Sequence, residues 1–296
     1  MKKFIFQNLL KKSLKRKKLI SNRSFIVRLF LNPDMLIQTL YCFFLRKQRS
    51  FFSIKTKTFW GREMNVVLPE VVSSDIRRFG FIEESVASFI INFASKGDCL
   101  IDIGAHFGFF SLLMGDVVGK DGSVHSFEPT PSTFLVLENN TKFDCNIFIN
   151  RNAIWDFNKV IELNDYGLTS SAFNSINESR DKKNDAEIPK TKIKVNAIKL
   201  DDYVRDHCIV PKLIKIDAES AEYQVLKGMD NILSKMDPLL CIELGDLGIN
   251  NVISSKKIIQ FLMNNYSYKP YEIKDGRLFI HKIKDNYEYT NLFFKK

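Results

Sequence analysis

The chain has 296 residues, 45% of them hydrophobic and 26% charged, which suits one α/β domain with extensions or two small domains. Five scattered cysteines form no Cys-x-x-Cys pair or Cys/His cluster, so the sequence shows neither a disulfide framework nor a metal site. The net charge of +10 is uneven, because residues 1–58 hold fifteen Lys or Arg and a single acid, a net +14. The remaining 29 basic and 33 acidic residues leave the rest of the chain at −4.

Residues 1–58 predict a basic, helical N-terminal extension, and residues 59–296 predict the main domain. The longest apolar run of the extension, residues 35–45, is about half of the roughly 20 residues that span a bilayer, and no signal-peptide cleavage site follows it. Mixed lysines and aromatics fit an anionic membrane surface, a subdomain packed on the main domain, or nucleic acid, with the last least favoured. We expect a cytoplasmic protein. If the extension binds a membrane surface, we expect the protein to be peripheral on the inner face of that membrane.

Strands and helices alternate along the main domain. Residues 65–70 predict a short edge strand, and residues 82–93 carry apolar side chains at helical spacing. Further strands are expected at 99–104, 123–129, 146–155, 159–164, 192–200, 212–217 and 239–244, with helices at 109–118, 131–143, 221–234 and 254–266. A hairpin over 268–283 turns at Asp275-Gly276. This order predicts a doubly wound, mostly parallel sheet that ends in an antiparallel hairpin.

The stretch "CLIDIGAHFGFFSLL" places two glycines between a buried strand and a helix. In doubly wound sheets, ligands bind at the carboxyl ends of the strands, and glycine lets the backbone approach them. Asp102 and Gly104 lie at the end of the first such strand. Glu128 ends the next strand, where a carboxylate can accept hydrogen bonds from both hydroxyls of a ribose. These residues together predict a nucleoside site.

A dinucleotide would call for the pattern G-x-G-x-x-G, which lets a pyrophosphate rest on the helix terminus. Here His106 occupies the position of the second glycine, and phenylalanines crowd the start of the helix. The turn therefore favours a nucleoside ligand without a pyrophosphate, such as a sulfonium amino acid attached to adenosine.

Four segments in order carry a family resemblance: "LIDIGAHFGFFSLL", "GSVHSFEPTPSTFLVLENN", "VNAIKLDDYV" and "KLIKIDAESAEYQVLKGM". Over about residues 98–265 the chain resembles the FkbM-type family of S-adenosylmethionine-dependent methyltransferases. The resemblance implies a class I methyltransferase (Rossmann-like) fold, the cofactor S-adenosylmethionine, and O-methylation of a sugar, glycan or other small-metabolite hydroxyl. The resemblance therefore also implies a role in bacterial surface-polysaccharide or secondary-metabolite biosynthesis.

Two groups of site residues follow, with no metal ligand among them. As catalytic carboxylates we predict Asp217 and Glu219, which follow an apolar strand, and Glu222 in the next helix; Glu243 ends the neighbouring strand in an analogous place. The residues predicted to bind the cofactor are Asp102, Gly104, Ala105, His106, Phe107, Gly108, Glu128, Pro129, Asn152 and Ala153. The chain departs from the family pattern twice, with His106 where Asn is usual and Ser220 where Gly is usual.

Three other functions compete with small-molecule O-methylation. An RNA-modifying methyltransferase would use the basic extension as a nucleic-acid arm. The strand ending at residue 217 is followed by "AESAE" instead of an Asn/Asp-Pro-Pro-aromatic loop, and no Pro-Cys pair offers a nucleophile. A non-catalytic cofactor-binding adaptor rests on the two departures alone. A nicotinamide oxidoreductase is disfavoured by the missing central glycine.

Overall fold

The computed structural model describes residues 2–22, 33–48, 50–175, 190–246, 252–274 and 276–296, and is built on an eight-stranded sheet. In spatial order its strands are β12 (Arg277–Ile280), β11 (Lys269–Lys274), β13 (Thr290–Lys295), β10 (Leu239–Leu244), β9 (Pro211–Ile216), β3 (Cys99–Ile103), β4 (Ser123–Phe127) and β5 (Ile147–Asn150). The five strands from β10 to β5 run parallel to one another, whereas β10 with β13, β13 with β11, and β11 with β12 pair antiparallel. The doubly wound, mostly parallel sheet is therefore confirmed.

The C-terminal hairpin joins the sheet differently from the expectation. Strands β11 and β12 form the antiparallel pair, but β13 lies between β11 and β10. The side chains of Leu292, Phe293 and Phe294 are buried, which explains why this last strand takes the more central place. Asp275 of the predicted turn lies outside the described residues.

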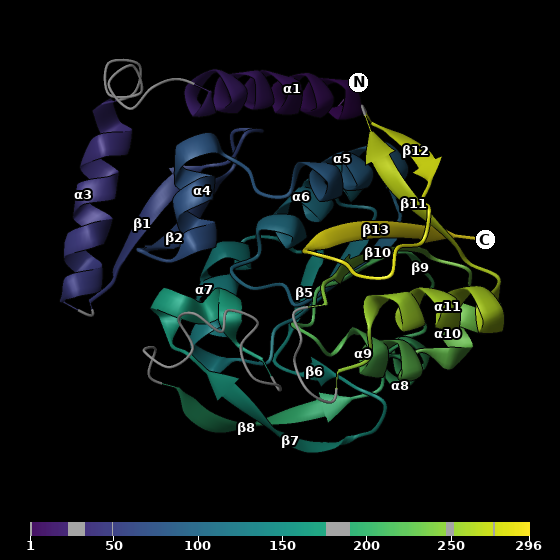
Figure 1. Ribbon diagram of the computed structural model, residues 1–296. Helices are drawn as coiled ribbons and strands as arrows, with labels where there is room; N and C mark the ends of the chain where they lie inside the picture. Colours follow the sequence, from purple (N-terminus) through teal and green to yellow (C-terminus); the bar gives the residue numbers. More distant parts are fainter. Residues whose placement is uncertain (1, 23–32, 49, 176–189, 247–251, 275) are drawn as a thin grey trace.

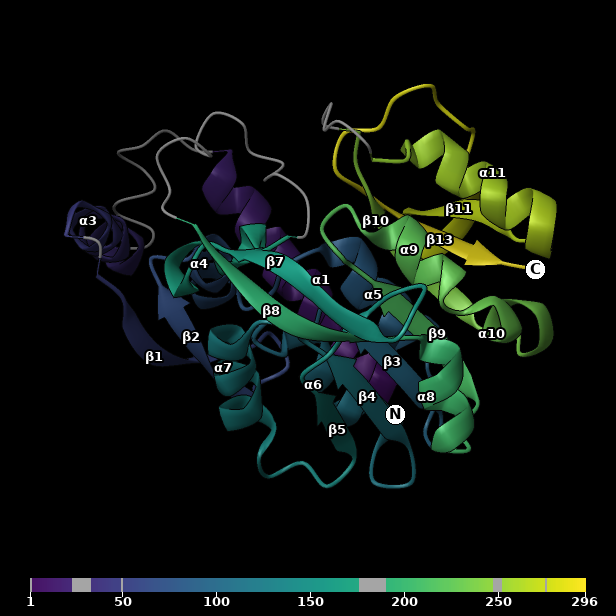
Figure 2. The same ribbon diagram turned by 90° about the horizontal axis from the view of Figure 1, so that it is seen from below.

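Helices cover both faces of the sheet (Figures 1 and 2). On one face, α5 (Glu84–Phe93) and α6 (Phe109–Val118) pack against alternate strand residues that include Leu100, Val124 and Leu213. On the other, the helices meet the intervening residues, among them Ile101, Ile214 and Ile216; these helices are α8 (Leu200–Asp206), α9 (Glu222–Lys227), α10 (Asp230–Lys235) and α11 (Ser255–Tyr266). Burial on both faces accounts for the nearly continuous apolar runs of the strands.

A second, three-stranded sheet lies beside the first, in the order β6 (Ala153–Ile154), β8 (Thr191–Ile198), β7 (Lys159–Asp165), and the short 3-10 helix η1 (Leu168–Phe173) follows β7. The single strand expected over 146–155 is thus divided, with β5 in the main sheet and β6 in the small one. The helix α7 (Pro131–Thr141) begins at a proline, as expected.

Strands β1 (Phe52–Lys57) and β2 (Glu63–Leu68) form an antiparallel pair, followed by the helix α4 (Val71–Phe79), which the sequence pattern does not predict. The carboxylate of Glu70 caps α4 by accepting from the backbone N–H groups of Val72 and Ser73, and Gly80 ends it at φ 79°. This cap fixes the first turn of α4, which forms part of the cavity described below.

The N-terminal helices pack on the main domain. Helix α1 (Lys2–Ser21) crosses α4 and α5, and its Phe6 and Leu10 are buried in the same core cluster as α5 and α6 (Figure 1). Ion pairs join Lys2 to Asp116 and Lys17 to Asp75, each at 3.6 Å. Helix α1 therefore matches the packed-subdomain interpretation of the extension.

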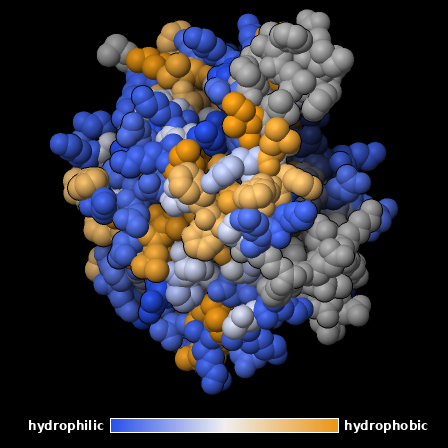
Figure 3. Space-filling view, turned by 90° about the vertical axis from the view of Figure 1, so that its left-hand side faces the viewer, coloured by the Kyte–Doolittle hydropathy of each residue, from blue (hydrophilic) through white to orange (hydrophobic). Residues whose placement is uncertain are grey.

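Helix α3 (Pro33–Lys47) packs beside β1 and β2, on the side of the molecule that Figure 3 shows. The predicted boundary at residue 58 separates two strands that pair with each other, and residues 23–32 of the extension lie outside the described residues. Among the helices that the structure describes, none is long and apolar enough to cross a bilayer.

Candidate functional site

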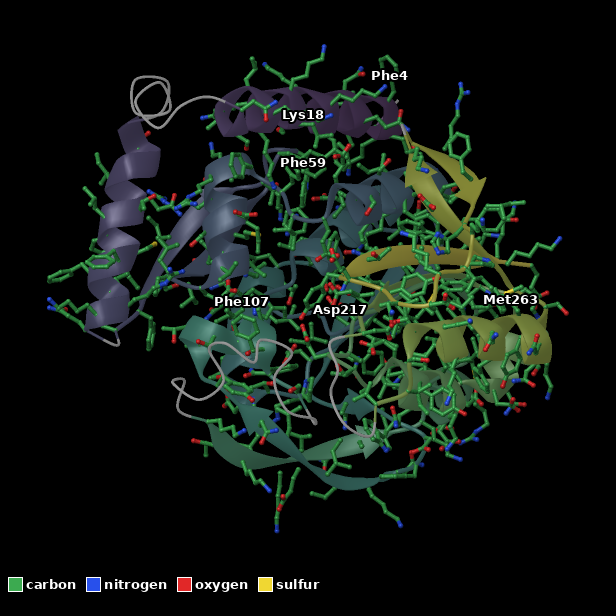
Figure 4. The ribbon with its side chains drawn as sticks, in the orientation of Figure 1. Phe4, Lys18, Phe59, Phe107, Asp217 and Met263 are labelled. Atoms are coloured by element: carbon green, nitrogen blue, oxygen red, sulfur yellow. The ribbon has the colours of Figure 1, made fainter. Side chains whose placement is uncertain are left out.

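A cavity of about 410 Å³ opens at the carboxyl ends of β3, β4, β9 and β10. Figure 4 shows Asp217 and Phe107 near the middle of the molecule, at this edge of the sheet. Eight of the ten residues predicted to bind the cofactor line the cavity: Gly104, Ala105, His106, Phe107, Glu128, Pro129, Asn152 and Ala153. Asp102 and Gly108 do not line it.

The two glycines of the turn are required by packing within the protein. At Gly104, where φ is +73°, a Cβ would lie 1.8 Å from the backbone oxygen of Asp217. At Gly108, where φ is +90°, a Cβ would lie 2.7 Å from a side-chain carbon of Leu137. We expected a side chain at Gly104 to meet the ligand, but it would meet the neighbouring strand end first. The close approach of the backbone at the end of β9 therefore explains Gly104, and the left-handed backbone conformation explains Gly108.

Glu128 is buried in the cavity wall and held by backbone groups. One carboxylate oxygen accepts from the N–H of Thr130 at 2.9 Å, and the other from the N–H of His106 at 3.1 Å. Burial raises the pKa of Glu128 to about 7, although these hydrogen bonds oppose the shift. The Thr130 side chain also donates to this carboxylate, and since a carboxylate has about four lone-pair sites, one stays open to a ligand hydroxyl. This geometry supports the predicted ribose contact.

His106 connects the glycine turn to η1. Its φ of 50° lies in the left-handed region, which histidine and asparagine adopt more readily than most side chains. The Nε2 atom lies 2.7 Å from the Oγ of Ser171 in η1. Burial lowers the pKa of His106 to about 4, so the ring is neutral at physiological pH. The departure from Asn thus keeps a residue suited to this backbone conformation.

Lys215 is a buried cation that our sequence reasoning missed. Its Nζ lies 3.1 Å from Asp217 and 3.7 Å from Asp102, and 5.2 Å from the centre of the Phe110 ring. Burial alone would lower its pKa, but the surrounding carboxylates raise it above its ordinary value. The other Asp102 oxygen accepts from Ser111 at 2.6 Å. Asp102 therefore positions Lys215 and α6 from behind the cavity wall.

Four carboxylates line the cavity beside Lys215: Glu83, Asp217, Glu219 and Glu243. Burial and the nearby Asp217 raise the pKa of Glu83 to about 7, and Asn291 donates to its carboxylate at 2.9 Å. Asp217, Glu219 and Glu243 offer oxygen atoms within 4.8 Å of one another, a spacing that can hold a cation. This end of the cavity is acidic overall and suits a ligand that carries positive charge.

Glu222, which we predicted to be catalytic, does not line the cavity. Its carboxylate accepts from the backbone N–H groups of Ala218 and Ser220, at 3.3 and 3.1 Å, and so holds the turn after β9. In that turn Ser220 adopts a φ of 76° and Glu219 a φ of 47°. A left-handed residue explains why glycine is usual in the family at position 220. Asp217 and Glu219, by contrast, do line the cavity.

The sequence analysis did not identify two charged residues of the cavity, Lys215 and Glu83, and only the first carries a signal in the sequence. Lys215 interrupts an apolar run, and an unpaired charge in a buried strand is costly, so a carboxylate partner could have been inferred. Glu83 precedes a helix in an ordinary polar position, and only the fold brings it beside Lys215.

Comparison with known families gives a match to the methyltransferase FkbM domain over residues 102–270, more than half of the chain. The chain belongs to the FkbM methyltransferase family. This agrees with the resemblance carried by the four sequence segments, which implies the cofactor S-adenosylmethionine. No curated protein matches the chain.

Solved structures that resemble this FkbM methyltransferase include methyltransferase FkbM from Methylobacillus flagellatus, at 14% identity and a TM-score of 0.45. The alignment covers 75% of this chain and 52% of that one, so the chain spans about half the length of the Methylobacillus protein. A Thermotoga maritima SAM-dependent O-methyltransferase aligns at 13% identity, TM-score 0.40, over 82% of this chain and 77% of its own. M. jannaschii TYW2 in complex with AdoMet aligns at 13% identity, TM-score 0.41, over 82% and 86%.

The cavity of the FkbM methyltransferase fits its cofactor. Glu128 lines the wall where a ribose would lie in this fold, and Asn152 and Ala153 line the wall near the end of β5. The acidic end suits the positive sulfonium and ammonium groups of S-adenosylmethionine, whereas it would repel a pyrophosphate. Gly104 and Gly108 contribute to this site by allowing the backbone conformation of the turn.

Proposed function

We propose that this FkbM methyltransferase O-methylates a hydroxyl of a sugar, a glycan or another small metabolite, in bacterial surface-polysaccharide or secondary-metabolite biosynthesis in the cytoplasm. One observation carries the proposal: Glu83, Asp217, Glu219 and Glu243 line the same cavity as Glu128. A hydroxyl that is methylated must lose its proton, and carboxylates near the acceptor can orient the hydroxyl and take that proton.

S-adenosylmethionine, when bound, supplies an activated methyl group for direct displacement by the acceptor oxygen. The protein aligns the two reactants and keeps water out. Glu128 holds the ribose, and the wall beside it carries apolar side chains, including Phe107 and Phe127. Asp217 is held by the ammonium of Lys215 at 3.1 Å, which fixes the carboxylate that we assign to orienting the acceptor hydroxyl.

Glu83 is the side chain best suited to accept the proton. A general base works best when its pKa lies near the working pH, and burial brings the pKa of Glu83 to about 7. The amide of Asn291 fixes the position of its carboxylate. Lys215 lowers the pKa of Glu83 against the effect of burial, and it forms an ion pair with Asp217.

A transfer assay with labelled methyl donor, screened against free and lipid-linked glycans, tests the proposal. Asp217→Asn and Glu83→Gln should each lower kcat by ~10²–10⁴-fold, while S-adenosylhomocysteine binding should weaken by less than about tenfold, because the remaining carboxylates still face its ammonium group. Glu162→Gln, on the exposed face of β7, is the matched control and should leave kcat unchanged. Full turnover in both cavity variants would contradict the assigned roles. The same assay with a chelator tests whether the three clustered carboxylates need a cation.

A further inference from the structure

Helix α3 carries apolar side chains on two neighbouring faces. Its inner face buries Gln38, Cys42 and Leu45, which lie toward β1, β2 and α4. The Gln38 amide donates to the backbone oxygen of Ser74 in α4, and Cys42 and Leu45 pack with Leu68. This face accounts for the attachment of α3 to the domain, and the neighbouring face stays largely exposed.

The outer face carries large apolar side chains at positions i, i+3, i+4 and i+7. Ile37, Leu40, Tyr41 and Phe44 have exposed fractions of 65%, 59%, 42% and 53%. That spacing places all four on one stripe of a helix. An amphipathic surface helix would carry polar residues there, so the stripe needs an explanation beyond the stability of the monomer.

The stripe extends onto the neighbouring strand. Phe52 of β1 meets Tyr41 edge to face, with ring centres 6.2 Å apart, and Phe51 and Phe43 are also more than half exposed. We call this set the outer apolar face: Ile37, Leu40, Tyr41, Phe43, Phe44, Phe51 and Phe52. Figure 3 shows apolar residues gathered in the middle of this side of the molecule, with hydrophilic residues around them.

Cations border the outer apolar face. Arg46 and Lys47 end α3 and are exposed, and Asp34 in its first turn is the only acid in residues 1–58. The carboxyl end of α1, which carries exposed Lys15, Arg16 and Lys18, lies near the amino end of α3 (Figure 1). The partner of this surface must therefore combine an apolar interior with negative charge.

The length of α3 decides how it could meet such a partner. Fifteen residues at 1.5 Å per residue give about 22 Å, shorter than the roughly 30 Å hydrocarbon core of a bilayer. Aromatic and aliphatic side chains on one face, with Lys and Arg beside them, are typical of helices that lie in the plane of a membrane interface. We propose that α3 docks this methyltransferase on an anionic lipid bilayer, with its outer apolar face inserted among the acyl chains.

Co-sedimentation with vesicles tests the proposal on the full chain. The vesicles contain phosphatidylcholine alone or equal parts of phosphatidylcholine and phosphatidylglycerol, at low salt. The double variant Leu40→Gln, Phe44→Gln removes two exposed apolar side chains without changing the charge. Its control, Leu135→Gln, Phe143→Gln, removes the same residue types from α7 and the segment after it, and Leu135 has the same 59% exposure as Leu40.

We expect the wild type and the control to bind the anionic vesicles, and to bind phosphatidylcholine at least tenfold more weakly. The α3 variant should bind the anionic vesicles about ten- to a hundredfold more weakly than the wild type, because each side chain would bury a large apolar area in lipid. All four substituted residues are exposed, so matching thermal melts should show intact folds.

Three outcomes would overturn the proposal. The wild type could ignore anionic vesicles, or the α3 variant could bind them as well as the wild type does, which would leave the cations alone responsible. Alternatively, ultracentrifugation without lipid could show a wild-type dimer that the α3 variant abolishes, together with no vesicle binding. That result would make the outer apolar face an interface between two copies of the chain.

Discussion

Phe6→Ala should destabilise the whole protein, although Phe6 lies far from the cavity in a segment that the sequence marks as an extension. Its side chain is 6% exposed and belongs to the core cluster that contains α5 and α6, with its ring 6.3 Å from that of Trp60. Truncating a buried phenylalanine costs about 3–5 kcal/mol, and a site at the outer edge of a core belongs at the lower end of that range.

The size of the effect can be converted into a melting temperature. With an unfolding entropy of about 2.1 cal/mol/K per residue, the 296-residue chain should lose ~5 °C in Tm for a loss of ~3 kcal/mol. The control is Phe4→Ala on the same helix, since Phe4 is 67% exposed and points away from the core (Figure 4). Scanning calorimetry measures both variants. Equal, small shifts in the two would show that α1 does not pack as described, and that the extension can be removed without harm to the domain.

Two further predictions concern the turn after β9 and the ribose contact. Ser220→Gly should raise the free energy of unfolding, measured by urea titration, by about 0.5–1 kcal/mol, because a residue with a side chain is strained at a φ of 76°. A lower free energy of unfolding would mean that the Ser220 side chain stabilises the protein by more than this strain destabilises it. The affinity for S-adenosylhomocysteine should fall as the pH drops below about 7, because burial raises the pKa of Glu128 to about 7 and the ionised carboxylate is the stronger acceptor for a ribose hydroxyl; calorimetry across that range should show the dependence, and Glu128→Gln should remove it.

The parts of the fold that could be predicted are those set by residues close together in the sequence. The sequence indicated the alternation of buried strands with helices, the glycine turn, and Glu128 at the end of β4. The carboxyl ends of the strands in a doubly wound sheet lie at one edge, so these residues were expected to share a site, and they do. The position of β13 between β10 and β11 could not, since a short apolar strand carries no information about which neighbour it will pair with.

The site shows the same division. Glu83 and Asn291 are 208 positions apart in the sequence, and only the packing of α5 beside β13 brings their side chains together. Glu222 looked catalytic because it follows Asp217 and Glu219 closely, but the backbone turn directs its carboxylate to the amides of Ala218 and Ser220. We expected Gly104 to be a glycine because it faces the ligand. The structure shows that the backbone oxygen of Asp217 leaves no room for a side chain there.

The central claim is that this cavity binds S-adenosylmethionine, with Glu128 holding the ribose. Calorimetry of S-adenosylhomocysteine and of NAD with the wild type, Glu128→Ala and Glu138→Ala, an exposed carboxylate on α7, tests it most directly. A hydrogen bond to a charged group contributes ~1.5–3 kcal/mol, so Glu128→Ala should weaken S-adenosylhomocysteine by roughly ten- to a hundredfold, while Glu138→Ala leaves it unchanged and NAD does not bind. Tight NAD binding, or undiminished S-adenosylhomocysteine binding by Glu128→Ala, would contradict the claim.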